Sequence, residues 1–209
     1  MLFEQYYQIA KVNVKHNLWK YLLMASFFLC ISPTILSIQN LDKKMSAKVL
    51  ELFVALIGII LFVPSFLPEN DSDIADLTAS KYRSVAGVSL TRILEAGLGL
   101  LLLAGAYIFA MKQSGCQFDT MPYLFGTISE GAFLGAIGLV VYTVTGTIAI
   151  GYMAPMLYYM IAISTGDKYL KKFYLFSMMK GSYIEKYYLG LISIGLFGLI
   201  ILIKHCKRR

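Results

Sequence analysis

The chain has 209 residues, of which 58% are apolar, and a mean hydropathy of +0.67. Because apolar runs of about twenty residues match the ~30 Å hydrocarbon core of a bilayer, these values exclude an ordinary soluble domain. The net charge is +7, but the basic residues are scattered between apolar runs and form no basic domain, so no nucleic-acid partner is expected. We predict an all-α, multi-pass membrane protein with a single transmembrane domain over residues 1–209.

The first seventeen residues, MLFEQYYQIAKVNVKHN, have the spacing of an amphipathic helix. Apolar side chains on one helical face with polar ones elsewhere suit a helix that lies in the membrane interface. We therefore predict an interfacial helix over residues 1–17, with a frayed cytoplasmic tail as the alternative. The residues on the apolar face are Phe3, Tyr6, Tyr7, Ala10 and Val14.

Six apolar runs follow and predict six transmembrane helices. The fourth and fifth runs are separated only by YTVTGTIAIGY, in which Gly146 and three threonines are the turn signal. About 40 residues are too many for one span, and five spans plus a re-entrant segment is the alternative to six. The predicted spans are residues 21–38, 49–67, 93–111, 124–144, 147–164 and 188–203.

Six spans place both termini on one side of the membrane. The tail KHCKRR, residues 204–209, is basic, and basic residues favour the cytoplasmic side. The full count of Lys and Arg decides little, because ten fall on the side of the termini and nine on the other. The prediction that both termini are cytoplasmic therefore rests mainly on the tail and on the resemblance described below.

Residues 68–92 form the longest loop on the predicted cytoplasmic side. Asp73 and Asp76 have the spacing of a helix N-cap and its third residue, which predicts a short helix. Such a helix would expose Ile74 and Leu77 on one face, where a monomer gains nothing from them. We predict a docking element, with an ordinary solvated loop as the alternative.

Residues 167–187 mix five lysines with aromatic and aliphatic side chains. This stretch is too charged to span the bilayer and too apolar for a solvated loop. We predict an outer amphipathic segment that lies along the interface or dips into it.

Glu130 lies seven residues into the fourth apolar run. A charge that faces lipid near mid-membrane costs up to about 3 kcal/mol, so Glu130 is expected to face the bundle or water. It would then belong to a substrate path or a gating contact. The alternatives are a hydrated carboxylate at the outer end of the span and a protonated one. Glu51 and Glu95 lie in the first turn of their spans and are expected to reach the interface.

Small residues recur in the third and fourth spans, where Gly131 and Gly135 form a small-x-x-x-small pair. Such pairs let helix backbones approach closely. They predict close packing inside the bundle, with a dimer seam as the alternative.

Several motifs occur together along the chain: a second span ending in VPSFLPEN, the polar stretch SKYRS, an Arg-bearing third span that begins SLTRILEAG, and an amphipathic segment before the last span. In this combination the chain resembles the type-2 ABC (ATP-binding cassette) transporter permeases over most of its length. In that family an acid after the second span precedes a coupling helix that seats on the ATP-hydrolysing subunit. The family's Gly-Thr pair after the acid is absent here, which leaves the register open. The resemblance assigns ATPase coupling to Glu69, Asp73, Ile74, Asp76, Leu77, Lys81 and Arg83.

The resemblance implies the permease subunit of an ABC exporter in the bacterial cytoplasmic membrane. It implies two copies of an ABC ATPase subunit and a second permease copy, identical or related, as partners within the lipid bilayer. The chain has no Gly-x-x-x-x-Gly-Lys-Ser/Thr loop, so ATP and Mg²⁺ are expected on the partner, and no enzyme activity or directly bound cofactor is expected here. Amphipathic peptides or lipid-like compounds are the expected cargo.

Two other classes of function compete with this interpretation. A stand-alone membrane protein, such as a peptide immunity factor, would need no ATPase. An intramembrane enzyme would need catalytic groups in the spans, but both histidines lie outside them and no His-Glu-x-x-His motif occurs. No catalytic residue is therefore predicted. The three cysteines are widely spaced and lack metal-ligand spacing, so no metal site is predicted either.

Overall fold

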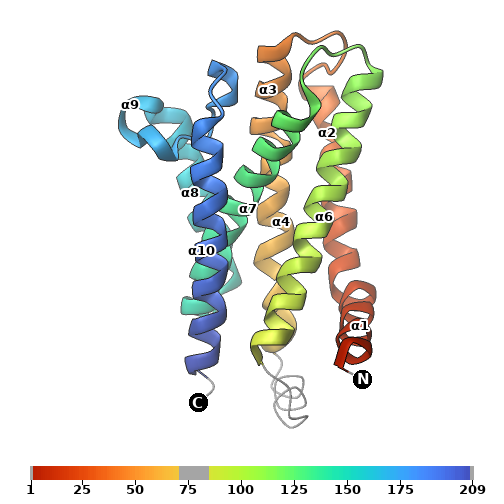
Figure 1. The fold of residues 1–209 in the computed structure, drawn as a ribbon, viewed down its shortest axis with the longest axis vertical. Helices are drawn as coiled ribbons and strands as arrows, with labels where there is room; N and C mark the ends of the chain where they lie inside the picture. The colour runs from red at the N-terminus through yellow and green to blue at the C-terminus, as the bar shows by residue number, and fades with distance from the viewer. Residues whose placement is uncertain (1, 71–84, 208–209) are drawn as a thin grey trace.

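The computed structural model describes residues 2–70 and 85–207, and these residues form helices and no strand. Six of the helical runs are long and apolar enough to cross a membrane (Figure 1). The six spans are Gln8–Ile35, Lys43–Pro68, Ala86–Gln113, Thr120–Thr145, Ile148–Thr165 and Ile184–Cys206. The prediction of six spans is therefore confirmed as far as helix length and composition can show it.

Most of the helices extend beyond the apolar runs that predicted them, because backbone hydrogen bonds continue through polar residues at each end. The long helices are α2 (Trp19–Ile35), α6 (Val85–Gln113), α7 (Thr120–Thr145), α8 (Ile148–Thr165) and α10 (Ile184–Lys207). The fourth and fifth spans are separate helices. Between them Gly146 has φ +70°, a left-handed conformation that favours glycine and ends α7.

The second span is interrupted rather than continuous. It consists of α3 (Lys43–Leu52), the 3₁₀ turn η2 (Val54–Leu56), α4 (Ile57–Phe62) and the 3₁₀ helix η3 (Val63–Asn70). A backbone carbonyl at such a break needs a partner inside the membrane. The hydroxyl of Tyr159 in α8 donates to the carbonyl of Leu52 at 2.9 Å and supplies it.

α7 lies at the centre of the bundle and packs against α4, α6, α8 and α10. Close approach to α4 depends on glycine. A Cβ atom added to Gly58 would lie 1.9 Å from the carbonyl oxygen of Gly131, and one added to Gly135 would lie 2.8 Å from that of Gly58. Gly131 and Gly135 therefore pack inside the bundle, as the first of the two interpretations of this pair predicted.

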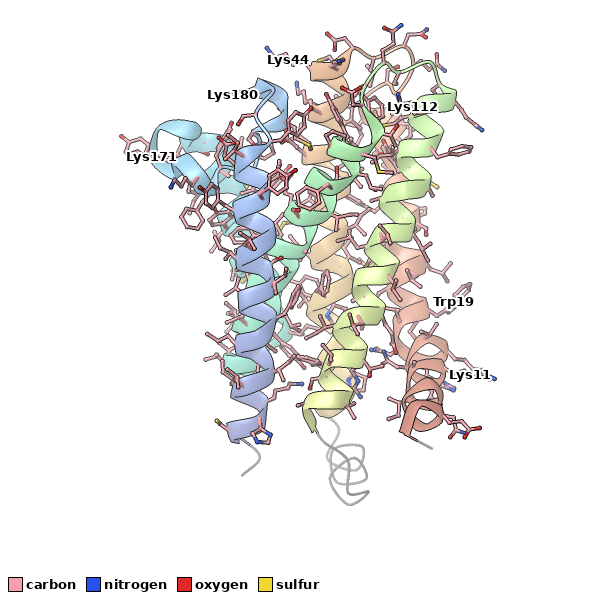
Figure 2. The ribbon with its side chains drawn as sticks, in the orientation of Figure 1. Lys11, Trp19, Lys44, Lys112, Lys171 and Lys180 are labelled. Atoms are coloured by element: carbon pink, nitrogen blue, oxygen red, sulfur yellow. The ribbon has the colours of Figure 1, made fainter. Side chains whose placement is uncertain are left out.

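Both termini lie at one end of the bundle, which we call the terminal end (Figure 1). The side chains agree: Lys204 near the C-terminus lies over the ring of Phe66 in η3, with Nζ 3.1 Å from the ring centroid. Figure 2 shows Lys11 at this end and Lys44, Lys112 and Lys180 at the far end. Which end faces the cytoplasm stays a prediction.

The N-terminal residues form α1 (Leu2–Asn13), which continues through the π-helical turn η1 (Val14–Leu18) into α2. The side chain of Asn13 is buried and donates to the carboxylate of Glu95 in α6. The helical character predicted for residues 1–17 is present over the described part, and its location in the membrane interface stays a prediction.

Candidate functional site

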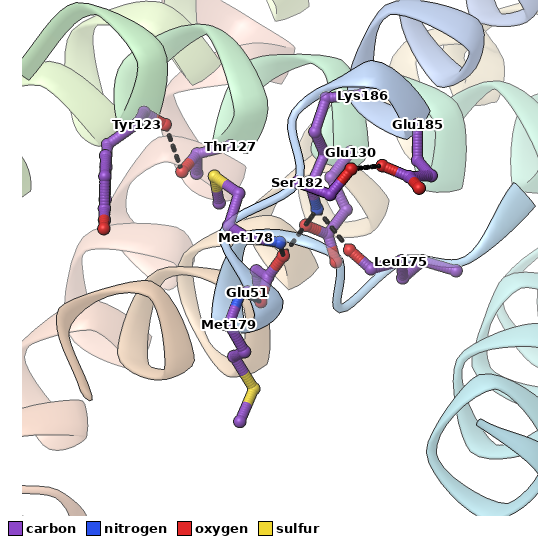
Figure 3. Close-up of polar contacts among 10 residues, drawn as sticks. All are labelled: Glu51, Tyr123, Thr127, Glu130, Leu175, Met178, Met179, Ser182, Glu185 and Lys186. Carbon is purple, nitrogen blue, oxygen red and sulfur yellow. Dashed lines mark hydrogen bonds and ion pairs between the residues drawn. The ribbon is translucent and has the colours of Figure 1, made fainter. Parts of the chain in front are cut away.

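Three charged side chains from three different spans meet in the part of the bundle toward the far end (Figure 3). Glu51 comes from the last turn of α3, Glu130 from α7, and Lys186 from the first turn of α10, and each has 0% of its surface exposed. Lys186 Nζ lies 2.8 Å from Oε1 of Glu51 and 2.6 Å from Oε2 of Glu130. We call these three residues the Glu–Lys–Glu cluster.

The cluster also holds a segment of backbone. Residues 174–182, here called the strap, connect the short helices α9 (Asp167–Leu170) and η4 (Lys171–Phe173) with α10 and contain η5 (Met178–Lys180). The amides of Met178 and Met179 donate to Oε1 and Oε2 of Glu51 at 2.8 and 3.2 Å. Lys186 Nζ also donates to the carbonyl of Leu175. One acid and one base therefore fix the strap to the bundle from two sides.

Local sequence explains why the strap can enter the bundle. Leu175, Phe176 and Met178 are apolar and buried, so their burial favours the inward position. Gly126 of α7 leaves room for the side chain of Met178, because a Cβ at this position would lie 2.4 Å from the sulfur. The strap then turns at Gly181, which has φ +78°. The outer amphipathic segment predicted over residues 167–187 thus includes a part that is buried in the bundle.

A charge cluster that is buried in a protein is stable only if its members compensate one another. An ion removed from water loses several kcal/mol of hydration, which its partners must return through ion pairs and hydrogen bonds. Glu51 meets this condition, since both its oxygens accept hydrogen bonds. Lys186 meets it too, with three oxygen partners.

Glu130 is less completely paired. Its Oε2 atom accepts from Lys186, but its Oε1 atom is buried and has no hydrogen-bond partner among the residues that the structure describes. The nearby hydroxyl groups of Tyr158 and Tyr159 donate to backbone carbonyls instead. No group of three or more His, Cys, Asp or Glu residues in the described part of the chain could hold a metal ion.

The structure decides several expectations about acids in the spans. Glu130 faces the bundle, and the alternative of a hydrated carboxylate at the end of the span is wrong because the side chain is fully buried. Glu51 is fully buried, so the expectation that it reaches the interface is also wrong, whereas the same expectation for Glu95 stays a prediction. Both side chains are buried, and polar partners compensate for the lost contact with water. Lys186 pairs with Glu51, and Asn13 donates to Glu95.

The residues predicted to couple to an ATPase are not part of this cluster. Glu69 belongs to η3, at the terminal end of the bundle. The other six, Asp73, Ile74, Asp76, Leu77, Lys81 and Arg83, lie outside the described residues.

Sequence reasoning missed Lys186 as a functional candidate, because it counted this residue among five lysines of an amphipathic segment. A signal was present. An acid inside a span usually pairs with another ionisable residue, and Lys186 stands at the start of the last apolar run.

An apolar cavity of about 480 Å³ lies between α6, α7 and α10. Leu94 of α6 and Leu191 and Ile194 of α10 line it and are largely exposed, so it opens to the side that lipid would cover. Small residues, including Ala132, Ser129 and Gly190, also line it.

The sequence and the structure of the chain were compared with those of known proteins. No family model, no curated protein and no solved structure matches this chain.

Proposed function

We propose that the chain is the membrane-spanning permease subunit of an ABC exporter, driven by a separate ATPase that docks at the terminal end. The observation that carries the proposal is the arrangement of the links between spans. Six spans alternate in direction, so two links join helix ends that lie at the terminal end: residues 69–85, and the two-residue turn Gly146–Thr147. A soluble partner at that end needs a larger contact than two residues can supply, and residues 69–85 provide the length.

The composition of that link supports the same proposal. It carries Glu69, Asp73 and Asp76 followed by Lys81 and Arg83, and so presents both signs of charge to a partner. Ile74 and Leu77 add an apolar contact, and burying each of them could contribute roughly 1.5 to 3 kcal/mol. The basic tail at the same end supports a cytoplasmic location for this surface.

Replacing both Ile74 and Leu77 with Glu tests the docking surface directly. We expect the double variant to lose copurification of the ATPase subunit, because two buried apolar contacts become charges that must be desolvated. Pull-down of the tagged permease from detergent extracts, followed by an ATPase assay, measures the loss.

The matched control places the same two charges at the far end. Met45 and Met121 are both exposed there, so Met45→Glu with Met121→Glu should leave copurification unchanged. Normal assembly and transport with Ile74→Glu and Leu77→Glu would contradict the docking surface. A chain that performs its whole task without any copurifying ATPase would favour the stand-alone membrane protein.

The apolar cavity supports amphipathic or lipid-like cargo within this proposal. A cavity that opens toward hydrocarbon and is lined mainly by aliphatic and aromatic side chains suits an apolar chain rather than a small polar solute. Within the same proposal, its position between α6 and α10 puts it next to the span that follows the docking link.

Filling the cavity tests the cargo class. Ala132→Phe is expected to abolish stimulation of the complex's ATPase by amphipathic peptides while basal ATPase activity stays, since the ring occupies the space that the cargo would use. Ala106→Phe is the control, because Ala106 is an exposed residue of α6 that does not line the cavity. Equal stimulation in both variants would exclude the cavity as the cargo site.

A further inference from the structure

We propose that the Glu–Lys–Glu cluster is a proton-binding site and that the proton resides on Oε1 of Glu130. The charges of the cluster support this assignment. One lysine faces two carboxyl groups, and all three side chains are fully buried inside the bundle. With both carboxyls ionised, a net negative charge would be enclosed in the bundle, which is costly in a medium of low dielectric constant. One bound proton makes the cluster neutral.

Hydrogen bonding identifies which carboxyl carries the proton. Oε1 of Glu51 accepts from Lys186 and from the Met178 amide, and Oε2 accepts from the Met179 amide. An ionised carboxylate is a pure acceptor, so this pattern fits an ionised Glu51. Glu130 instead has one oxygen on Lys186 and a second oxygen with no partner in the described part of the chain. The free oxygen is the position open to a proton.

Among the described residues, no other titratable group near Glu130 donates a hydrogen bond to its Oε1 atom. Lys186 from α10 and Glu51 from α3 are the charged groups that face it. Tyr158 and Tyr159 from α8 are the neighbouring hydroxyl groups, and each donates to a backbone carbonyl, of Phe173 and Leu52 respectively. Neither tyrosine therefore donates to the free oxygen of Glu130.

The proton has a structural consequence, because the same cluster holds the strap. Loss of the proton leaves two carboxylates competing for Lys186, which also bonds the carbonyl of Leu175. Like charges brought together in a buried site repel. Release of the strap from α3 relieves this repulsion by admitting water, so proton occupancy controls how firmly the strap is held.

Infrared spectroscopy of the full chain in lipid nanodiscs tests the site. We expect the absorption of a protonated carboxylic acid at neutral pH, lost in Glu130→Gln and shifted in frequency in Glu130→Asp. Glu95→Gln identifies any band that comes from Glu95, a second buried carboxyl outside the cluster whose Oε1 atom also has no hydrogen-bond partner among the described residues. Glu51→Asp, which keeps an ionised acid next to Lys186, should leave the frequency unchanged.

Hydrogen exchange of the Met178 and Met179 amides tests the consequence. After correction for intrinsic rates, their protection should fall about tenfold or more as the infrared band disappears at high pH. In Glu130→Gln, protection should persist and no longer follow that transition. Absence of the band from the wild-type chain would overturn the proposal whether or not any variant folds. So would a band that Glu130→Gln leaves unchanged or that Glu51→Asp removes, or protection that Glu130→Gln abolishes.

Discussion

Lys186→Met is expected to destabilise the folded chain by about 3–5 kcal/mol, the cost of breaking a buried ion pair by removing one partner. The methionine fills a similar volume but leaves Glu51 and Glu130 without their shared cation. It also removes the donor to the Leu175 carbonyl, so the strap should loosen as well. Reversible denaturation in mixed lipid–detergent micelles measures the change in unfolding free energy.

Two further variants separate lost charge from lost packing. Lys44→Met removes an exposed lysine of α3 and should change stability little, as surface substitutions generally do. Adding Glu51→Gln to Lys186→Met removes the uncompensated carboxylate and should recover part of the loss. Wild-type stability in Lys186→Met alone would show that the cluster does not hold the bundle together.

Gly58→Ala is expected to produce the second large effect. The added methyl group would lie 1.9 Å from the carbonyl oxygen of Gly131, so α4 and α7 must separate. Overpacking of a well-packed core costs typically 1–3 kcal/mol, and a backbone atom as the obstacle leaves little room for local relaxation. Thermal unfolding of the detergent-purified variant, followed by loss of helical circular dichroism, measures the cost.

Gly105→Ala is the matched control for this prediction. It adds the same methyl group to a helical glycine of α6, but nothing lies within 4 Å of the new atom. Its stability should equal or slightly exceed that of the wild type, because alanine favours helix. Equal effects of the two substitutions would mean that close packing of α4 on α7 is not what Gly58 provides.

The spans could be predicted from the sequence because hydrophobic length is a local property. Runs near twenty residues report the bilayer thickness, and Gly146 was a sufficient turn signal between α7 and α8. The break in the second span was not predictable in this way. Val54, Ala55 and Leu56 are as apolar as their neighbours, and the 3₁₀ turn is stabilised by Tyr159, a residue more than a hundred positions away.

The buried cluster shows the limit of local reasoning more sharply. Glu130 stood out because it interrupts an apolar run. Glu51 lies in the first turn of its predicted span and Lys186 just before the last predicted span, where charged residues ordinarily reach water, so local sequence offered no reason to bury them. Their burial depends on the strap, which covers this part of the bundle and brings backbone donors to Glu51. Such a cover is a property of the tertiary fold.

The order of Glu51, Glu130 and Lys186 along the chain matters for biogenesis. A ribosome delivers both acids to the translocon before it delivers the lysine that pairs with them. Until then, each acid must stay hydrated or protonated, since an unpaired carboxylate in lipid is expensive. Insertion of the sixth helix therefore supplies both the cation of the cluster and a helix that packs on α7. A product that terminates before Lys186 would therefore leave both acids without their shared cation.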